Sequence, residues 1–116
     1  MFWDCRLEHD GLPGEVSERA RLIILDHVGI ALRARHAAAL SPSMEAALRR
    51  LGQVGGQSSG HSGGQATVIG DAEGYTPTAA ALFNGNLGHA LDFDDTHAPG
   101  SIHSGAPIIP AALAAR

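Results

Sequence analysis

Two regions with helical periodicity, separated by a stretch rich in glycine, serine and glutamine, most limit the folds open to this sequence. Residues 52–65 carry no periodic apolar pattern, which is typical of a loop or linker. On both sides of this stretch, apolar residues recur at three- and four-residue spacing, as expected of helices that bury one face. A chain of 116 residues is long enough for one modest domain with a core. The sequence therefore predicts one mainly α-helical domain.

The region before this stretch is predicted to form two helices. The first covers residues 12–35, and Gly29 inside it suggests a close helix crossing. The second begins at Ser41 and Pro42, which suit a helix start, and ends at Gly52, which suits a left-handed C-terminal residue. The predicted apolar faces are Val16, Ala20, Ile23, Ile24, Val28 and Leu32 in the first helix, and Met44, Ala47, Leu48 and Leu51 in the second.

After the stretch, the pattern predicts one short β-like segment and a third helix. Residues 66–69 read ATVI, a short run suited to a strand. Thr76 and Pro77 then mark a helix start, because a capping hydroxyl precedes a proline in the first turn. The Asn84-Gly85 pair is expected to break or kink this helix.

The C-terminal part is predicted to contain two further helical stretches. One covers residues 87–95 and leads into a loop over residues 96–105. The other starts near Pro107 or Pro110 and reaches Arg116 without a C-terminal cap. We therefore expect a last helix that is cut rather than completed.

Composition and charge argue against several classes of protein. The net charge is −4 and all eight basic residues are arginines, with no clustered basic face, so no nucleic-acid partner is expected. Cys5 is the only cysteine, which excludes an internal disulfide and favours a reducing compartment. No apolar run approaches the roughly 20 residues that span a bilayer, and the first residues do not form a signal peptide. These features predict a cytoplasmic protein without a membrane partner.

The segment GGQSSGHS at residues 55–62 matches the spacing of a phosphate-binding loop, except that His61 replaces the lysine. A phosphate-binding loop follows a strand and opens a helix, whereas this segment follows a predicted helix. Nucleotide binding is therefore not expected.

The densest group of polar residues lies between positions 84 and 104. If residues 87–96 are helical, His89, Asp92 and Thr96 share one face, and Asp92 can orient His89 or His103 for proton transfer. The polar residues of the group are Asn84, His89, Asp92, Asp94, Asp95, Thr96, His97 and His103.

Two other interpretations of the same residues remain open. In the first, Asp94, Asp95 and Thr96 satisfy the turn after the helix while the histidines are solvated. In the second, the group binds a metal through Asp92, Asp95, His97 and His103, although no regular ligand spacing supports this.

The sequence also resembles a known family. The runs AALFNGNLGHALDFDDTH at residues 80–97 and GSIHSGAPIIPAALA at residues 100–114 resemble the signature of the MmgE/PrpD family, which includes 2-methylcitrate dehydratase and cis-aconitate decarboxylase. The resemblance covers residues 13–116, read as a partial helical domain truncated at its C-terminus, and leaves residues 1–12 as an N-terminal extension. It implies a partial helical bundle from the family's large helical domain.

The resemblance also implies an activity. Family members act without a cofactor or metal on small di- and tricarboxylates, as homodimers, and the matching active-site positions are Asp92, Thr96 and His103. Lysines that complete the family's site lie beyond Arg116, and this chain has no lysine. We therefore expect a fragment of a 2-methylcitrate dehydratase-like lyase that is inactive or weakly active alone. The alternatives are a decarboxylase, an epimerase, a non-catalytic helical interaction module or a metal-binding module.

Overall fold

The computed structural model describes residues 11–55 and 66–115. Cys5 lies outside these residues. So do nearly all of the expected N-terminal extension and nearly all of the segment at residues 55–62 that matches the spacing of a phosphate-binding loop. The described elements are α1 (Gly14–Ala37), α2 (Leu40–Arg50), β1 (Ala66–Thr67), β2 (Gly74–Tyr75), α3 (Pro77–His89), a short 3-10 turn (Ala98–Gly100) and α4 (Gly105–Ala114). The predicted mainly helical fold with a short β segment is confirmed.

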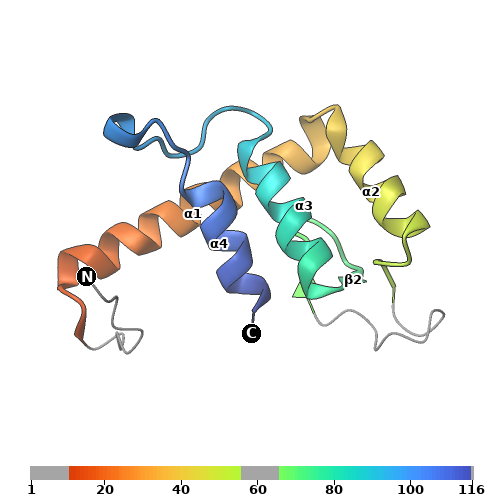
Figure 1. Ribbon diagram of the computed structural model, residues 1–116, viewed down its shortest axis with the longest axis horizontal. Helices are drawn as coiled ribbons and strands as arrows, with labels where there is room; N and C mark the ends of the chain where they lie inside the picture. Colours follow the sequence, from red (N-terminus) through yellow and green to blue (C-terminus); the bar gives the residue numbers. More distant parts are fainter. Residues whose placement is uncertain (1–10, 56–65, 116) are drawn as a thin grey trace.

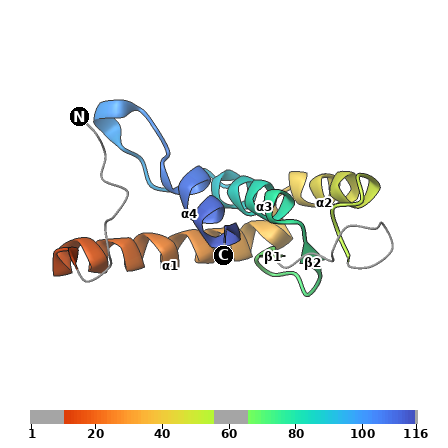
Figure 2. The ribbon, with the colours of Figure 1, turned by 60° about the horizontal axis from the view of Figure 1, so that its bottom comes forward.

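The helices form two layers. The long helix α1 runs along one side of the molecule, and α4, α3 and α2 follow one another along the other side (Figures 1 and 2). α3 packs against both α4 and α1. β1 and β2 pair antiparallel, with Ala66 opposite Tyr75, and lie beside α3. Among the described residues, no helix has both the length and the apolar character needed to cross a bilayer.

The core lies where α3 meets the second half of α1 and the small sheet. Phe83 and Leu87 of α3 are fully buried together with Tyr75. The rings of Tyr75 and Phe83 meet edge to face with centroids 6.3 Å apart, a favourable aromatic geometry. The remaining buried members are smaller: Ala31, Ala34, Leu48, Val68, Ala79 and Ala80.

The predicted apolar face of the first helix is wrong. Val16 and Leu32 are each nearly half exposed. The residues that α1 buries are His27, Ile30, Ala31 and Ala34. For the N-terminal part of this predicted face the reason is visible in Figure 1, where the first half of α1 extends beyond the helices that could cover it, whereas Leu32 lies in the second half of α1. The close crossing expected at Gly29 is also absent, because a Cβ there would meet nothing within 4 Å.

Two of the predicted helix ends are confirmed and one helix start is corrected. Thr76 caps α3, since its Oγ1 accepts the Ala79 N–H at 3.4 Å. Gly52 has the predicted left-handed φ of 68°. α2, however, begins at Leu40, and the Ser41 hydroxyl donates to the backbone oxygen of Arg35 instead of capping the helix.

The predicted break at Asn84-Gly85 is wrong, because α3 continues through both residues. The Asn84 side chain finds its partners outside the helix: Oδ1 accepts the Ile69 N–H at 2.8 Å and Nδ2 donates to the Thr67 carbonyl at 2.9 Å. A Cβ on Gly85 would lie 3.0 Å from the Ala106 carbonyl oxygen. Asn84 therefore holds the small sheet against α3, and Gly85 allows α4 to pack closely against α3.

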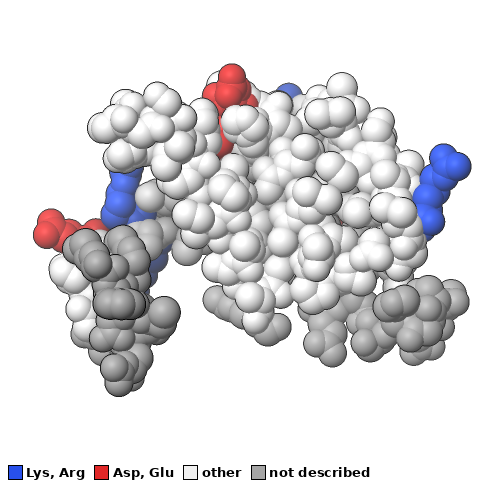
Figure 3. Space-filling view, viewed as in Figure 1, with Lys and Arg blue, Asp and Glu red and all other residues white. Residues whose placement is uncertain are grey.

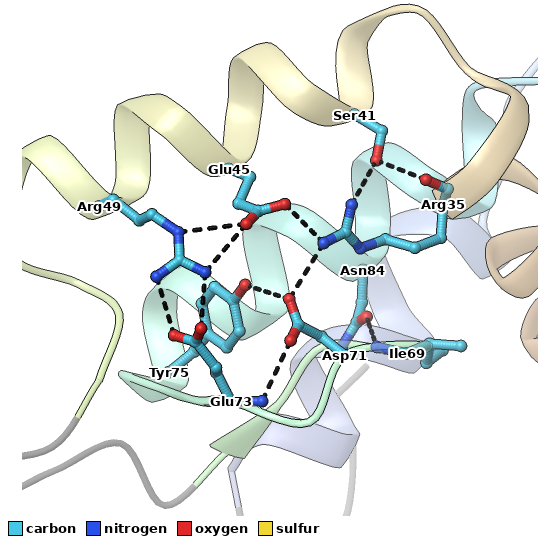
Figure 4. Close-up of polar contacts among 9 residues, drawn as sticks. All are labelled: Arg35, Ser41, Glu45, Arg49, Ile69, Asp71, Glu73, Tyr75 and Asn84. Carbon is cyan, nitrogen blue, oxygen red and sulfur yellow. Dashed lines mark hydrogen bonds and ion pairs between the residues drawn. The ribbon is translucent and has the colours of Figure 1, made fainter.

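A network of charged side chains joins α1, α2 and the turn before β2 (Figure 4). The Arg35 guanidinium contacts Glu45 at 2.5 Å and Asp71 at 3.1 Å. Arg49 pairs with Glu45 and Glu73 at the exposed edge of the network. The two arginines thus hold three segments together around shared carboxylates.

Candidate functional site

The polar segment after α3 is a turn and not the predicted helix over residues 87–95. α3 ends at His89, and the Asp92 N–H donates to the His89 carbonyl at 3.0 Å. Asp92 has a φ of 59°, a left-handed conformation that aspartate tolerates better than most residues and that no helix contains. His89, Asp92 and Thr96 therefore do not share a helix face.

This turn brings two histidines onto one buried carboxylate. The Oδ2 atom of Asp94 lies 3.0 Å from Nδ1 of His89 and 3.1 Å from Nδ1 of His103. The two imidazole rings meet edge to face with centroids 4.9 Å apart. The Asp94 side chain is only 3% exposed, whereas the histidines are partly open to solvent.

The protonation of the cluster follows from its contacts. Burial alone would favour neutral Asp94, but the hydrogen bond from His89 and the charges of both imidazoles hold its pKa below the ordinary value. Asp94 is therefore a carboxylate at neutral pH, which can only accept hydrogen bonds. Each Nδ1 must carry a proton to donate to it, and this leaves both Nε2 atoms free on the far side of their rings.

Both imidazoles line an open groove between α3 and α4. The groove encloses about 560 Å³, and its other lining residues are Ala81, Leu82, Gly85, Asn86, Ala106 and Pro107. Among residues 11–55 and 66–115, no arginine lines it. The molecular face over α3 and α4 carries few charged side chains, which lie mainly at its edges (Figure 3). The groove can hold a small molecule, and its polar groups are the two imidazoles and one amide.

The three residues predicted for catalysis do not form one contact group. His103 lies against a carboxylate, but that carboxylate belongs to Asp94. Asp92 and Thr96 are exposed. Sequence reasoning placed Asp94 and His89 in the polar group but did not pair them, because the assumed helix put His89 on one face with Asp92. Residues five positions apart do not lie on the same face of a helix. His89 and Asp94 can therefore pair only because α3 ends at His89.

Asp95 does not satisfy the turn directly after α3, as the turn interpretation predicted, but binds the start of α4. Its Oδ1 accepts the Gly105 N–H at 2.9 Å and its Oδ2 accepts the Ser104 hydroxyl at 3.1 Å. The side chain thus satisfies a free amide at the start of α4 and places a negative charge at the positive end of that helix. Gly105 is required here, since a Cβ would overlap the Asp95 carboxylate.

The donors predicted for a metal are not brought together. Within residues 11–55 and 66–115, the grouping of three such donors is His89, Asp94 and His103, whose ligand atoms lie within 4.8 Å of one another. Two imidazoles and a carboxylate are a donor set that zinc or iron accepts. In the present arrangement these donors hydrogen-bond to each other.

The chain matches one protein-family model over nearly its whole length. The model of the MmgE/PrpD N-terminal domain matches residues 3–116. The chain belongs to the MmgE/PrpD family. The family assignment agrees with the resemblance of the segments around His89 and His103.

Relatives of this MmgE/PrpD chain include two fungal proteins. It is 30% identical over 113 residues to the cis-aconitate decarboxylase-like protein oryM of Aspergillus oryzae (strain ATCC 42149 / RIB 40). It is 29% identical over 113 residues to the cis-aconitate decarboxylase of Aspergillus terreus. Both alignments cover 97% of this chain but only 21% of the relative, so the chain spans about a fifth of their length. No solved structure matches the chain.

Proposed function

We propose that this chain contributes the proton-transfer part of a lyase that acts on small di- or tricarboxylates. The observation that carries the proposal is the His103–Asp94 pair beside an open groove. A buried carboxylate that accepts from Nδ1 fixes the imidazole tautomer and leaves Nε2 to exchange protons with a bound substrate.

The relatives favour cis-aconitate as the substrate and decarboxylation as the reaction. In that reaction the C–C bond to one carboxylate breaks and CO2 leaves. The electron pair left on carbon then takes a proton from the His103 imidazolium. The His103 imidazolium is regenerated by a proton from solvent.

Dehydration of 2-methylcitrate is the second candidate, and the two imidazoles on Asp94 favour it. A base removes a proton from carbon, the electron pair forms the double bond, and the hydroxyl leaves as water after protonation. Elimination of this kind uses both a base and an acid.

Asp92 and Thr96 are proposed to bind the substrate. Both are exposed next to the turn that carries Asp94, so their side chains are open to a ligand. No arginine in the part of the chain that the structure describes lines the groove, and the chain has no lysine. We therefore place the carboxylate-binding cations outside these 116 residues, in a homodimeric cytoplasmic enzyme, and expect slow turnover by the chain alone.

The proposal is tested by incubating the purified chain with cis-aconitate and with 2-methylcitrate and following products by NMR. Slow turnover that His103→Gln abolishes and His97→Gln leaves unchanged is the expected result. His97 is a suitable control because it is exposed and its side chain pairs only with the nearby Gly100 N–H among the described contacts. Absence of turnover in the unsubstituted chain would instead favour a non-catalytic helical module.

A further inference from the structure

We propose that His89 is a second proton-transfer residue, held for this task by the same carboxylate, Asp94, that positions His103. The inference rests on the proposed function and extends it from one imidazole to two. It assigns Asp94 as a positioning residue, since its carboxylate faces the two Nδ1 atoms and not the groove.

One carboxylate oxygen of Asp94 is shared by the two histidines. The Oδ2 atom of Asp94 lies within hydrogen-bond distance of Nδ1 of both histidines, at 3.0 and 3.1 Å. Oδ1 also lies 3.1 Å from Nδ1 of His89. Charge-assisted hydrogen bonds of this kind are stronger than neutral ones, and they fix the direction of both rings.

The contacts with Asp94 also fix where the Nε2 atoms of His89 and His103 point. Nδ1 and Nε2 lie on different sides of an imidazole ring, so a ring that turns Nδ1 to Asp94 turns Nε2 away from it. Both rings line the groove between α3 and α4. With their centroids 4.9 Å apart, both can reach neighbouring atoms of one small substrate.

The two imidazole rings can act as the base and the acid of one reaction. In the elimination of water, one neutral imidazole accepts the proton from carbon at Nε2. The other, as imidazolium, donates a proton to the departing hydroxyl, so the site ends with the same number of protons and the two roles exchanged. A proton moved between the rings through solvent restores the starting state. Decarboxylation requires only the donor.

The structure contains an internal control for this geometry. His97 accepts the Gly100 N–H at its Nδ1, at 3.1 Å, so its proton must lie on Nε2. His89 and His103 are predicted to hold their protons on Nδ1, the opposite tautomer. One sample of the protein is therefore expected to contain both tautomers, which can be compared directly.

The tautomers are measured by long-range 1H–15N NMR of histidine-labelled chain at a pH of about 8.5, where free imidazoles are neutral, in the presence of EDTA. Single His→Gln substitutions assign the signals. We expect the Nδ1–H form for His89 and His103 and the Nε2–H form for His97. In Asp94→Ala, the first two should lose this preference and His97 should keep its own. An Nε2–H form for His89 in the unsubstituted chain would overturn the proposal, whether or not the variant folds.

Participation of His89 is measured by labelling with diethyl pyrocarbonate, which modifies neutral imidazole, with and without excess cis-aconitate. We expect cis-aconitate to lower labelling of His89 and His103 several-fold, with no change at His97. Protection of His103 alone would overturn the role of His89 and leave the proposed function standing. Protection of neither would reject both.

Discussion

The imidazole of His27 in α1 lies against Gly88 of α3, at a point where a Cβ on residue 88 would overlap the ring. His27 is 3% exposed, and both its ring nitrogens lack a hydrogen-bond partner among the described residues. The α1–α3 crossing therefore depends on a glycine that leaves room for a buried ring.

Gly88→Ala is expected to destabilise the protein by about 1–3 kcal/mol, because the added methyl group forces the ring or the helix to move. Gly29→Ala is the matched control, since a Cβ there meets nothing within 4 Å. It should stabilise α1 by about 1 kcal/mol through helix propensity alone. Urea unfolding of both variants measures these effects, and equal effects of the two substitutions would contradict the close packing at Gly88.

Buried His27 is expected to make stability depend on pH. Burial lowers its pKa below 6.5 in the folded protein, and the nearby Asp94, Asp26 and Asp95 oppose this only in part. Between the lowered folded pKa and about 6.5, the unfolded chain binds more protons than the folded one. The contribution of neutral His27 to stability is therefore complete above about pH 6.5 and is lost as the pH falls toward the pKa of His27 in the folded protein.

His27→Leu removes this titration. Free energies of unfolding measured from about pH 7 to about pH 5 should fall less steeply in the variant than in the unsubstituted protein. Taking the difference between the two proteins removes the contribution of the other histidines. Parallel slopes would show that burial does not lower the pKa of His27 in the folded state.

Arg35 and Arg49 occupy one network but differ in burial. The Arg35 side chain is 16% exposed, so its removal leaves Asp71 in a partly buried site without its charge partner, while Glu45 keeps only its pair with Arg49. Arg35→Gln is expected to lower the free energy of unfolding by about 2–3 kcal/mol. Arg49→Gln should change it little, because Arg49 is exposed and solvent screens its ion pairs. Similar losses in both variants would contradict this ranking.

Asp95 is expected to stabilise α4 and not to take part in proton transfer. Asp95→Ala removes the acceptor for the Gly105 N–H and should cost about 1 kcal/mol. Asp95→Asn keeps an acceptor oxygen and should cost less. Hydrogen exchange at Gly105 reports the lost bond directly, and unchanged protection in Asp95→Ala would rule out this cap.

Local chemistry made part of the fold predictable. Thr76-Pro77 and Gly52 act only on the helix end beside them, so their roles as helix start and helix end follow from sequence alone. The continuation of α3 through Asn84-Gly85 did not, because the partners of Asn84 lie in a segment 15 to 17 residues earlier. The buried face of α1 was missed for a similar reason, since it depends on which helices cover it.

The candidate site was likewise only partly predictable from the sequence. The sequence identified His103 and the polar segment around it, which the family resemblance also marked. It did not identify Asp94 as the partner, because that pairing requires α3 to end at His89 and the chain to turn back on itself. The left-handed residue that permits this turn is Asp92, which a helical reading of the segment had placed on a helix face.

Chemical rescue of His103→Ala tests the central claim most directly. The substitution should lower turnover of cis-aconitate at least about 100-fold, the range expected for loss of a positioned proton-transfer group. Free imidazole should then restore part of the rate in His103→Ala and leave His97→Ala unchanged. A His103→Ala protein that keeps its full rate, or one that loses it and gains nothing from imidazole, would contradict proton transfer by His103.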